Sequence, residues 1–417
     1  MGSVRPVGRG FFPLDEVLCL LPGSLTPHGY ECLTRLASWM PFERAAELLD
    51  DFLGIQVSQG SSNRYTQAAG AAYVQIQAEE VERIEREAPP VKPGAAEKLQ
   101  MSVDGAMVPL RHGIWAEVKT LVIGEVQPPV LEPSGERVVH TRNLSYFSRK
   151  VTAEEFQRLA LVEVHRRGIE AAPQVAAIMD GAEWEQGFTD YHCPRATRIL
   201  DFPHAAEHIN QVGEFLHGEH TPESQAWLET QLHNLKHEGP EQLLLDLQQL
   251  QQQYPASQAM AGNLAYLVKR KAQLQYPKFQ EQGWPIGSGI AESANKLVVE
   301  ARMKGSGMHW AEQNVNPMLA LRNIICSDRW KEEWPKIEDR LRQNVRFRKR
   351  KLHQSRRVEP VLPPPTVPAL PMVDESILEA LSARLEQKSQ PQPPKKNPWR
   401  NFKFGKALYQ RPTPPKN

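Results

Sequence analysis

The chain has 417 residues, of which 40% are hydrophobic, and its formal net charge is +1. This length predicts two or three domains, and the hydrophobic content is enough for an ordinary buried core. No run approaches the roughly 20 apolar residues of a membrane helix, and the N-terminus lacks a signal-peptide pattern, so we expect a cytoplasmic, nucleoid-associated protein. The four cysteines are widely spaced, which indicates neither a zinc ribbon nor a disulfide framework.

The first predicted domain is helical and covers residues 29–90. Its segment PFERAAELLDDFLGIQVSQGSSNRYTQAAG resembles a helix-turn-helix, with a first helix that ends at Gly54 and a second helix that is N-capped by Ser61 or Ser62. In that arrangement Arg64, near the start of the second helix, would face DNA bases. A plain helical hairpin has the same pattern, so both interpretations stay open.

A Pro- and Gly-rich break then introduces an α/β domain over residues 97–330. Alternating and β-branched residues predict five strands, over residues 99–105, 115–126, 136–147, 174–181 and 197–202. A helix over 152–168 is predicted after the third strand, with Thr152 as N-cap and Glu155 completing a capping box. Helical patterns dominate after the fifth strand. The order predicts a mixed α/β sheet with a helical insertion at about 216–278.

Two Asp-Gly pairs are predicted at strand ends, with Asp104 in MSVDGAMVPL and Asp180 in VAAIMDGAEW. Ligand groups collect beyond strand ends in open α/β sheets, although an Asp-Gly pair there is commonly only a turn. A third acid, Glu292, lies early in a helix after the Gly- and Ser-rich approach IGSGIAES. Alone it would be an acid favoured by the helix dipole. Together, two Asp and one Glu are oxygen ligands of the kind that Mg²⁺ takes for phosphate chemistry.

The segments VDGAMVPL, IMDGAEW, LDFPHAAEH and IGSGIAESANKLVVEARMKGSGMHW resemble the insertion-sequence DDE transposases of the ISKra group, over about residues 29–330. This resemblance implies a ribonuclease H-like core. The first Asp lies on its first strand, the second Asp follows its fourth strand, and the Glu lies on a helix after a helical insertion. By motif these acids are Asp104, Asp180 and Glu292, which would hold two Mg²⁺ or Mn²⁺ ions.

The same resemblance implies what the protein does. It would cleave DNA at the terminal inverted repeats of an insertion sequence and join the ends to target DNA. A homodimer or higher oligomer on DNA is implied as well. The segment over residues 1–28 carries no motif that adds to this interpretation.

Several further residues are candidates for contacts with DNA. Lys296 lies one helical turn after the Glu of the motif and could reach a phosphate, or form an ordinary i,i+4 ion pair. Arg302 and Lys304 place positive charge beside the glycines of RMKGSGMHW, which suits close approach to DNA. Trp310 and Trp184 could stack on a base or anchor the core.

The C-terminal part of the chain is basic. Residues 331–357 are predicted to form a basic helix, and 358–417 a Pro-rich basic tail that is largely disordered. Nine Arg or Lys and no Asp or Glu stand between Arg340 and Arg357. Such a run is either a solvated tail or a sequence-independent contact to phosphates.

Two other functions stay open from the sequence. The run HAAEH matches a zinc-peptidase signature in which His204 and His208 bind the ion and Glu207 is the general base. No third ligand segment stands out downstream. Alternatively, the chain is a DNA-binding protein with an inactive transposase core, which would rely on the N-terminal helices and the basic tail.

Overall fold

The computed structural model describes residues 21, 25–91, 96–133, 135 and 137–355, with the side chains of 348–355 left out. The predicted Pro-rich tail and most of the N-terminal segment 1–28 lie outside these residues. The chain divides into two compact units, residues 1–352 and residues 353–417. Within the described part, no helix has both the length and the apolar character needed to span a membrane.

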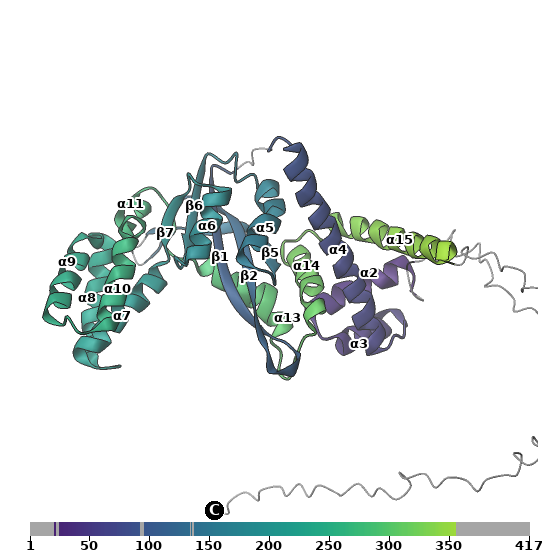
Figure 1. Ribbon diagram of the computed structural model, residues 1–417, viewed down its shortest axis with the longest axis horizontal. Helices are drawn as coiled ribbons and strands as arrows, with labels where there is room; N and C mark the ends of the chain where they lie inside the picture. Colours follow the sequence, from purple (N-terminus) through teal and green to yellow (C-terminus); the bar gives the residue numbers. More distant parts are fainter. Residues whose placement is uncertain (1–20, 22–24, 92–95, 134, 136, 356–417) are drawn as a thin grey trace, which may run out of the picture. The chain divides into compact units, whose positions relative to one another are not determined.

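A five-stranded mixed sheet forms the centre of the fold (Figure 1). Its strands are β1 (Lys98–Pro109), β2 (Trp115–Val126), β5 (Thr141–Arg149), β6 (Gln174–Met179) and β7 (Thr197–Leu200). Their order is β5-β2-β1-β6-β7, in which β1, β2 and β5 are antiparallel neighbours while β6 and β7 run parallel to β1. The predicted mixed α/β sheet is confirmed.

The third predicted strand is divided. Residues 137–138 form β4 (Arg137–Val138), which pairs with β3 (Val130–Leu131) in a separate two-stranded ribbon, and the sheet strand β5 begins only at Thr141. The alternating pattern runs through both pieces, so the sequence does not reveal the break. Strand β6 has five buried residues in succession because both faces of the sheet are covered.

Helices α5 (Ala153–Arg167) and α6 (Glu183–His192) cover one face of the sheet, with Phe156 and Phe188 buried beneath them. Helix α5 begins as predicted, because the Thr152 side chain accepts a hydrogen bond from the Glu155 backbone amide at 3.3 Å. It ends at Gly168 in the left-handed conformation that glycine favours.

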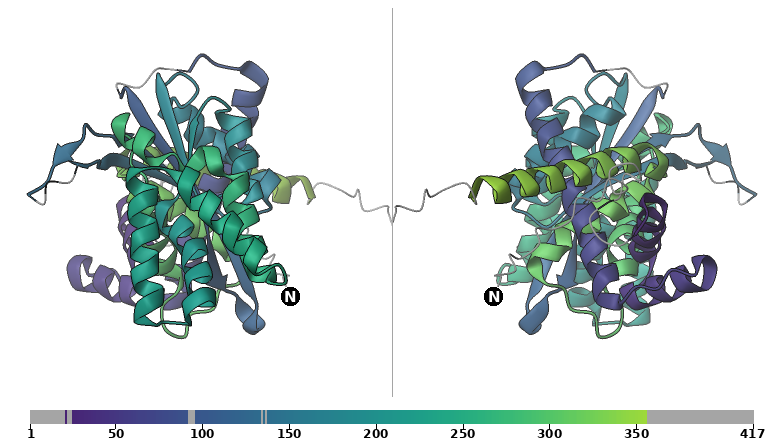
Figure 2. Two further views of the ribbon diagram at one scale, coloured as in Figure 1. Left: turned by 90° about the vertical axis from the view of Figure 1, so that its left-hand side faces the viewer. Right: turned by 90° about the vertical axis from the view of Figure 1, so that its right-hand side faces the viewer.

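A helical insertion follows β7 without a break. It consists of α7 (Phe202–His217), α8 (Pro222–His237), α9 (Pro240–Gln253), α10 (Gln258–Lys269) and α11 (Tyr276–Glu281). These helices lie together at the β7 side of the sheet (Figures 1 and 2). The sequence predicted the insertion at about 216–278; in the structure the helices begin at Phe202, directly after the strand, and reach Glu281.

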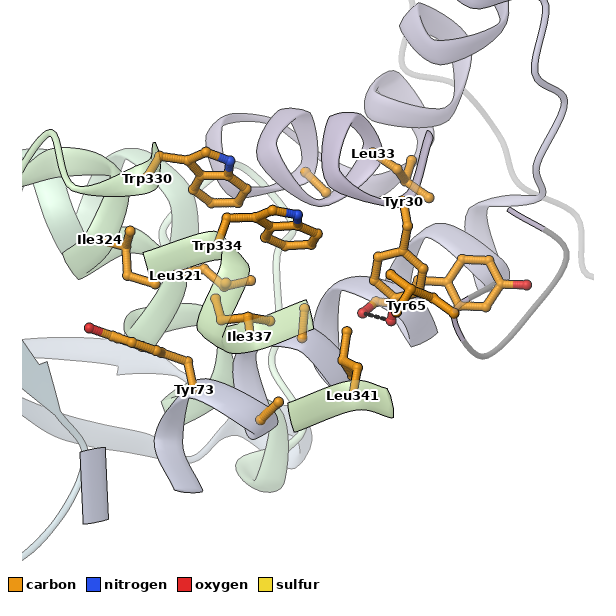
Figure 3. Close-up of a cluster of buried hydrophobic side chains, with 14 of the residues drawn as sticks. Tyr30, Leu33, Tyr65, Tyr73, Leu321, Ile324, Trp330, Trp334, Ile337 and Leu341 are labelled. Atoms are coloured by element: carbon orange, nitrogen blue, oxygen red, sulfur yellow. Dashed lines mark hydrogen bonds between the residues drawn. The ribbon is translucent and has the colours of Figure 1, made fainter. Parts of the chain in front are cut away.

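The N-terminal helices α2 (Pro27–Trp39), α3 (Phe42–Leu53) and α4 (Gln59–Glu87) share one hydrophobic core with α14 (Val315–Cys326) and α15 (Trp330–Ser355). Figure 3 shows this core, in which the Tyr30 ring contacts the rings of Tyr65 and Trp334, and Trp334 stacks on Trp330. Glycine is required at Gly70, because a Cβ there would lie 2.1 Å from the Pro317 carbonyl oxygen. The α4 helix therefore packs closely against α14.

The turn between α3 and α4 differs in part from the prediction. Helix α3 ends at Gly54 as expected, with φ of 65°. The N-cap of α4 is Ser58, and not Ser61 or Ser62, because the Ser58 hydroxyl accepts a hydrogen bond from the Ser61 amide at 3.1 Å. The helix thus starts three residues earlier, and Ser62 becomes a buried residue of its packing face.

The last part of the α/β domain is a continuous helical stretch on the sheet. Helix α12 (Gly289–Ala294) passes into a π-helical segment, Asn295–Glu300, and then into α13 (Ala301–Met303). Its apolar residues pack against β1 and β2, and this packing sets the position of Glu292 relative to the sheet.

Candidate active site

Three aspartates occupy one row across the three parallel strands. The β1/β6 pairing has an offset of 76 residues (174 minus 98), the same that separates Asp104 from Asp180. The β6/β7 pairing has an offset of 21 (197 minus 176), which leads from Asp180 to Asp201. Because neighbouring strands lie about 4.8 Å apart, this register sets the backbone positions of the three aspartates side by side, and the charges of Asp104 and Asp201 act on Asp180.

The two Asp-Gly pairs have different local structures. Asp180 follows β6, and Gly181 turns the chain with φ of 85°, as the sequence predicted. Asp104, in contrast, does not end its strand, because β1 continues to Pro109. The Asp104–Gly105 pair therefore lies within a strand, and the predicted turn there is wrong.

Burial governs the electrostatics of this row of aspartates. Burial, together with the charges of Asp104, Asp201 and Glu207, raises the pKa of Asp180 to about 7. Burial also raises the pKa of Asp104 and that of Asp201, although hydrogen bonds oppose both shifts. No cation pairs with these three carboxyl groups among the side chains that the structure places. The row is thus a set of neighbouring acids in which the charged forms are disfavoured by burial and, at Asp180, by the neighbouring charges.

Asp201 is the residue of this row that sequence reasoning did not assign. It follows β7 at the N-cap position of α7, and its Oδ1 accepts a hydrogen bond from the Ser288 amide at 2.5 Å. Asp201 therefore ties the Gly-rich approach to α12 to the edge of the sheet. The sequence does show a third Asp near the end of a predicted strand. Only the β6/β7 pairing, however, reveals that this Asp lies beside the other two.

Glu292 differs from the aspartates in its surroundings. Its side chain is 70% exposed, and its Oε1 accepts a hydrogen bond from the Lys296 Nζ at 2.6 Å. The i,i+4 ion pair considered for Lys296 is thus present. The charge of Glu292 still acts on Asp104, where it contributes to raising the pKa of that carboxyl group.

The stretch that carries Glu292 is nevertheless fixed to the row of aspartates. Asn295 lies three residues further on, and its Nδ2 donates to Oδ2 of Asp104 at 2.8 Å. The other oxygen of Asp104 accepts a hydrogen bond from the Gly105 amide at 2.6 Å. Both oxygens of this carboxylate are therefore oriented by the chain.

Helix α10 of the insertion braces the Asp180 turn. The Tyr266 hydroxyl donates to the Asp180 carbonyl oxygen, and the Arg270 Nε donates to the Gly181 carbonyl oxygen at 3.1 Å. Glu185 accepts hydrogen bonds from the Gly181 and Ala182 amides, and burial raises its pKa to about 8, with a smaller effect from the charge of Asp180. The turn thus holds its shape through contacts from two sides.

The residues predicted to contact DNA fall into two groups. Arg302 and Trp310 are buried, with 2% and 5% of their surface exposed, and the Arg302 guanidinium lies over the Trp310 ring. The Trp310 indole donates to the Met303 carbonyl oxygen at 3.1 Å. These two side chains anchor the core, and their burial leaves no surface for the DNA contact that the sequence suggested.

Other members of that set remain accessible. Lys304 pairs with Glu300 at 2.6 Å, and Arg64 is exposed on α4. Trp184 is partly buried, edge-on to Phe156. The DNA contacts predicted for these residues stay predictions.

The HAAEH segment lies on α7 beside this site. His208 stacks on Tyr266, with ring centroids 3.8 Å apart, and its Nδ1 is 2.7 Å from the Asn263 Oδ1. A carboxylate oxygen of Glu207 lies 3.5 Å from the Nδ1 of His204, and the Glu207 side chain is largely exposed. The packing accounts for His208 without a metal ion.

Within the described ranges, no three His, Cys, Asp or Glu side chains converge closely enough to hold a metal ion as they stand. The exposed rotamer of Glu292 keeps its carboxylate with Lys296. No protein-family model matches the chain, and no curated protein matches its sequence. Any function must therefore be argued from the motifs and from the geometry of this site.

Proposed function

We propose that this chain is a DDE-type transposase that cleaves DNA at the ends of an insertion sequence and joins them to target DNA, using Asp104, Asp180 and Glu292. The observation that carries this proposal is the register of the sheet, which sets Asp104 of the first strand beside Asp180, directly after the fourth. The strand order and the helical insertion before Glu292 also match a ribonuclease H-like core. We propose that core as the fold family.

The donor set fits hard divalent cations. Asp104 and Asp180 are oxygen donors with raised pKa values and no cationic partner among the placed side chains, so a bound cation would remove their repulsion. Glu292 would complete the set after its side chain leaves Lys296. Two bound Mg²⁺ or Mn²⁺ ions would supply an activated oxygen nucleophile and stabilise the leaving oxygen of the phosphodiester.

The chain's own groups prepare this chemistry. The Asn295 and Gly105 N–H groups orient the Asp104 carboxylate, and the Tyr266 hydroxyl fixes the backbone at Asp180. Asp201 holds the Ser288 amide and with it the approach to α12. Lys296, once released from Glu292, would be free to bind a DNA phosphate beside the site.

The natural partner in this proposal is DNA, bound by a homodimer or a higher oligomer that brings two ends together. A cytoplasmic, nucleoid-associated location is proposed with it. The second candidate, a DNA-binding protein with an inactive core, would keep the helices α2–α4 as its binding part and would not need the row of aspartates.

The test is cleavage and strand transfer of labelled, end-bearing DNA by the purified full chain in Mg²⁺ or Mn²⁺. The wild type is compared with Asp104→Asn, Asp180→Asn and Glu292→Gln, with Glu300→Gln as a matched control on the same helical stretch. We expect activity in the wild type and the control, and none in the other three. DNA binding without cleavage in any variant would support the inactive-core alternative, and full activity of Asp104→Asn would reject the catalytic assignment.

A further inference from the structure

Asn295 lies at the junction between the helical stretch and the row of aspartates. It is the first residue of the π-helical segment and is only 5% exposed. Single π turns inside α-helices occur frequently at functional sites, because the extra residue re-aims neighbouring side chains. The turn here lies three residues after Glu292 and directs the Asn295 Nδ2 to Asp104 Oδ2 at 2.8 Å.

One half of this amide group has no partner. The Oδ1 of Asn295 is buried and accepts no hydrogen bond within the part of the chain that the structure describes. A buried polar atom without a partner costs about 1–3 kcal/mol. The neighbours of Asn295 in this stretch, Ala294 and Val298, are apolar core residues, so an apolar side chain would avoid that cost. In this orientation the amide therefore satisfies its nitrogen but not its oxygen.

The distance to Asp104 suits a shared cation. Two oxygens at right angles around Mg²⁺, each about 2.1 Å from the ion, lie about 3.0 Å apart. Rotation of the Asn295 amide by half a turn exchanges Nδ2 and Oδ1 and places the oxygen where the nitrogen now lies, 2.8 Å from Asp104 Oδ2. In the absence of a cation the nitrogen must face the carboxylate, because an ionised carboxylate only accepts hydrogen bonds.

We propose that Asn295 is a ligand of the divalent cation held by Asp104, through its carboxamide oxygen. This inference rests on the proposed function, since it extends the set of ligands for the same ion. The chemistry favours a neutral donor at this position: three carboxyl groups with raised pKa values already repel one another in the row. A carboxamide adds an oxygen without adding charge.

The experiment is a Mn²⁺ titration of the full chain without DNA, followed by the electron paramagnetic resonance signal of free Mn²⁺. Asn295→Ala removes the oxygen, and Asn295→Asp keeps an oxygen but removes the N–H donor. Asn323→Ala is the matched control, because Asn323 is a buried asparagine of α14 whose side-chain amide bonds to the Ser148 backbone, away from the row of aspartates. Asp104→Asn gives the level of binding outside the site, and circular dichroism melts verify that each variant is folded.

We expect Asn295→Ala to weaken Mn²⁺ binding about tenfold or more, with Asn295→Asp within about threefold of the wild type and Asn323→Ala unchanged. Wild-type affinity in Asn295→Ala would overturn the inference. Equal loss in Asn295→Ala and Asn295→Asp would also overturn it, because Asn295 would then act only through its N–H group. Absence of Mn²⁺ binding in the wild type would instead reject the cation site of the proposed function, and the inference with it.

Discussion

The two halves of the candidate site differ in how their acids are held. The strand half consists of Asp104, Asp180 and Asp201, which are set in a row by sheet register and are largely withdrawn from solvent. The helix half consists of Glu292 and Lys296, which form an exposed ion pair with side-chain exposures of 70% and 65%. The strand half is therefore fixed before any ligand arrives, whereas the helix half must rearrange.

The acids of the strand half and the acid of the helix half therefore suit two different tasks in the proposed cation site. Carboxyl groups that strands hold at fixed neighbouring positions cannot move apart, so their charged forms repel one another. A bound cation would remove this repulsion. A carboxylate on an exposed helix costs little to place, and under the proposed function it would join the site after the cation and DNA are bound. The base of the helix half is nevertheless rigid, because Arg302 and Trp310 are buried beneath it. Only its outer side chains are free to move.

The largest effect is expected from Asp180→Asn, which removes an acid of the strand half. We expect the rate of DNA cleavage to fall by about 100-fold or more. Residues that only hydrogen-bond to a metal ligand already change metal affinity or activity by about 10- to 100-fold, and Asp180 is itself proposed as a ligand. The variant should also unfold at higher denaturant concentration than the wild type at pH 8 without metal, since a repelling charge is gone. Cleavage kinetics and urea unfolding measure the two results. Lost activity with lowered stability would contradict the account of the strand half.

The next effect concerns the base of the helix half. Trp310→Ala removes a buried ring that packs beside Phe42 and Arg302, and such truncations cost about 3–5 kcal/mol. We expect a lower melting temperature for Trp310→Ala, measured by circular dichroism. Phe42→Ala should also lower the melting temperature, but by less. An unchanged melting temperature together with weaker DNA binding would show that Trp310 contacts DNA after all.

A smaller effect follows from pH. The pKa of Asp180 is about 7 in the folded chain, against 3.8 for the unperturbed group, so the folded state binds more protons between these values. The stabilisation is complete below the unperturbed value and is lost as pH rises through about 7. We expect the stability difference between wild type and Asp180→Asn to grow from pH 5 to pH 8, by about 1–2 kcal/mol after allowance for solvent screening. A difference that does not vary with pH would contradict this assignment.

The smallest effect is expected from Lys296→Ala. Exposed i,i+4 ion pairs contribute little to stability, so the melting temperature should not change measurably. Without its partner, however, the Glu292 carboxylate is free to turn, and half-saturation with Mn²⁺ should occur at a slightly lower concentration. A clear loss of stability would mean that the helix half is as fixed as the strand half.

The sequence predicted those features that depend on local patterns. The capped helix α5 and the C-cap at Gly54 follow from residues a few positions apart, and the five strands follow from short alternating or β-branched runs. The spacing of 76 residues between Asp104 and Asp180 equals the β1/β6 offset, but the sequence alone does not show that it is a register.

Other features depend on contacts between distant residues. Asn295 and Asp104 are separated by 191 positions, so no local pattern joins them. Asp201 enters the site only through the β6/β7 pairing. Trp310 is buried through its contacts with Phe42 and Arg302, and the sequence around Trp310 does not reveal these contacts.

The most direct test of the account is cleavage of the polypeptide by hydroxyl radicals, which Fe²⁺ in place of Mg²⁺ generates from added hydrogen peroxide with ascorbate as reductant. The cut positions are mapped by mass spectrometry. We predict cuts around residues 104, 180 and 292, suppressed by excess Mg²⁺ and absent from Asp180→Asn. Such a result would place both halves of the site at one cation. Cuts confined to the HAAEH segment, residues 204–208, would contradict the account and return attention to the histidines.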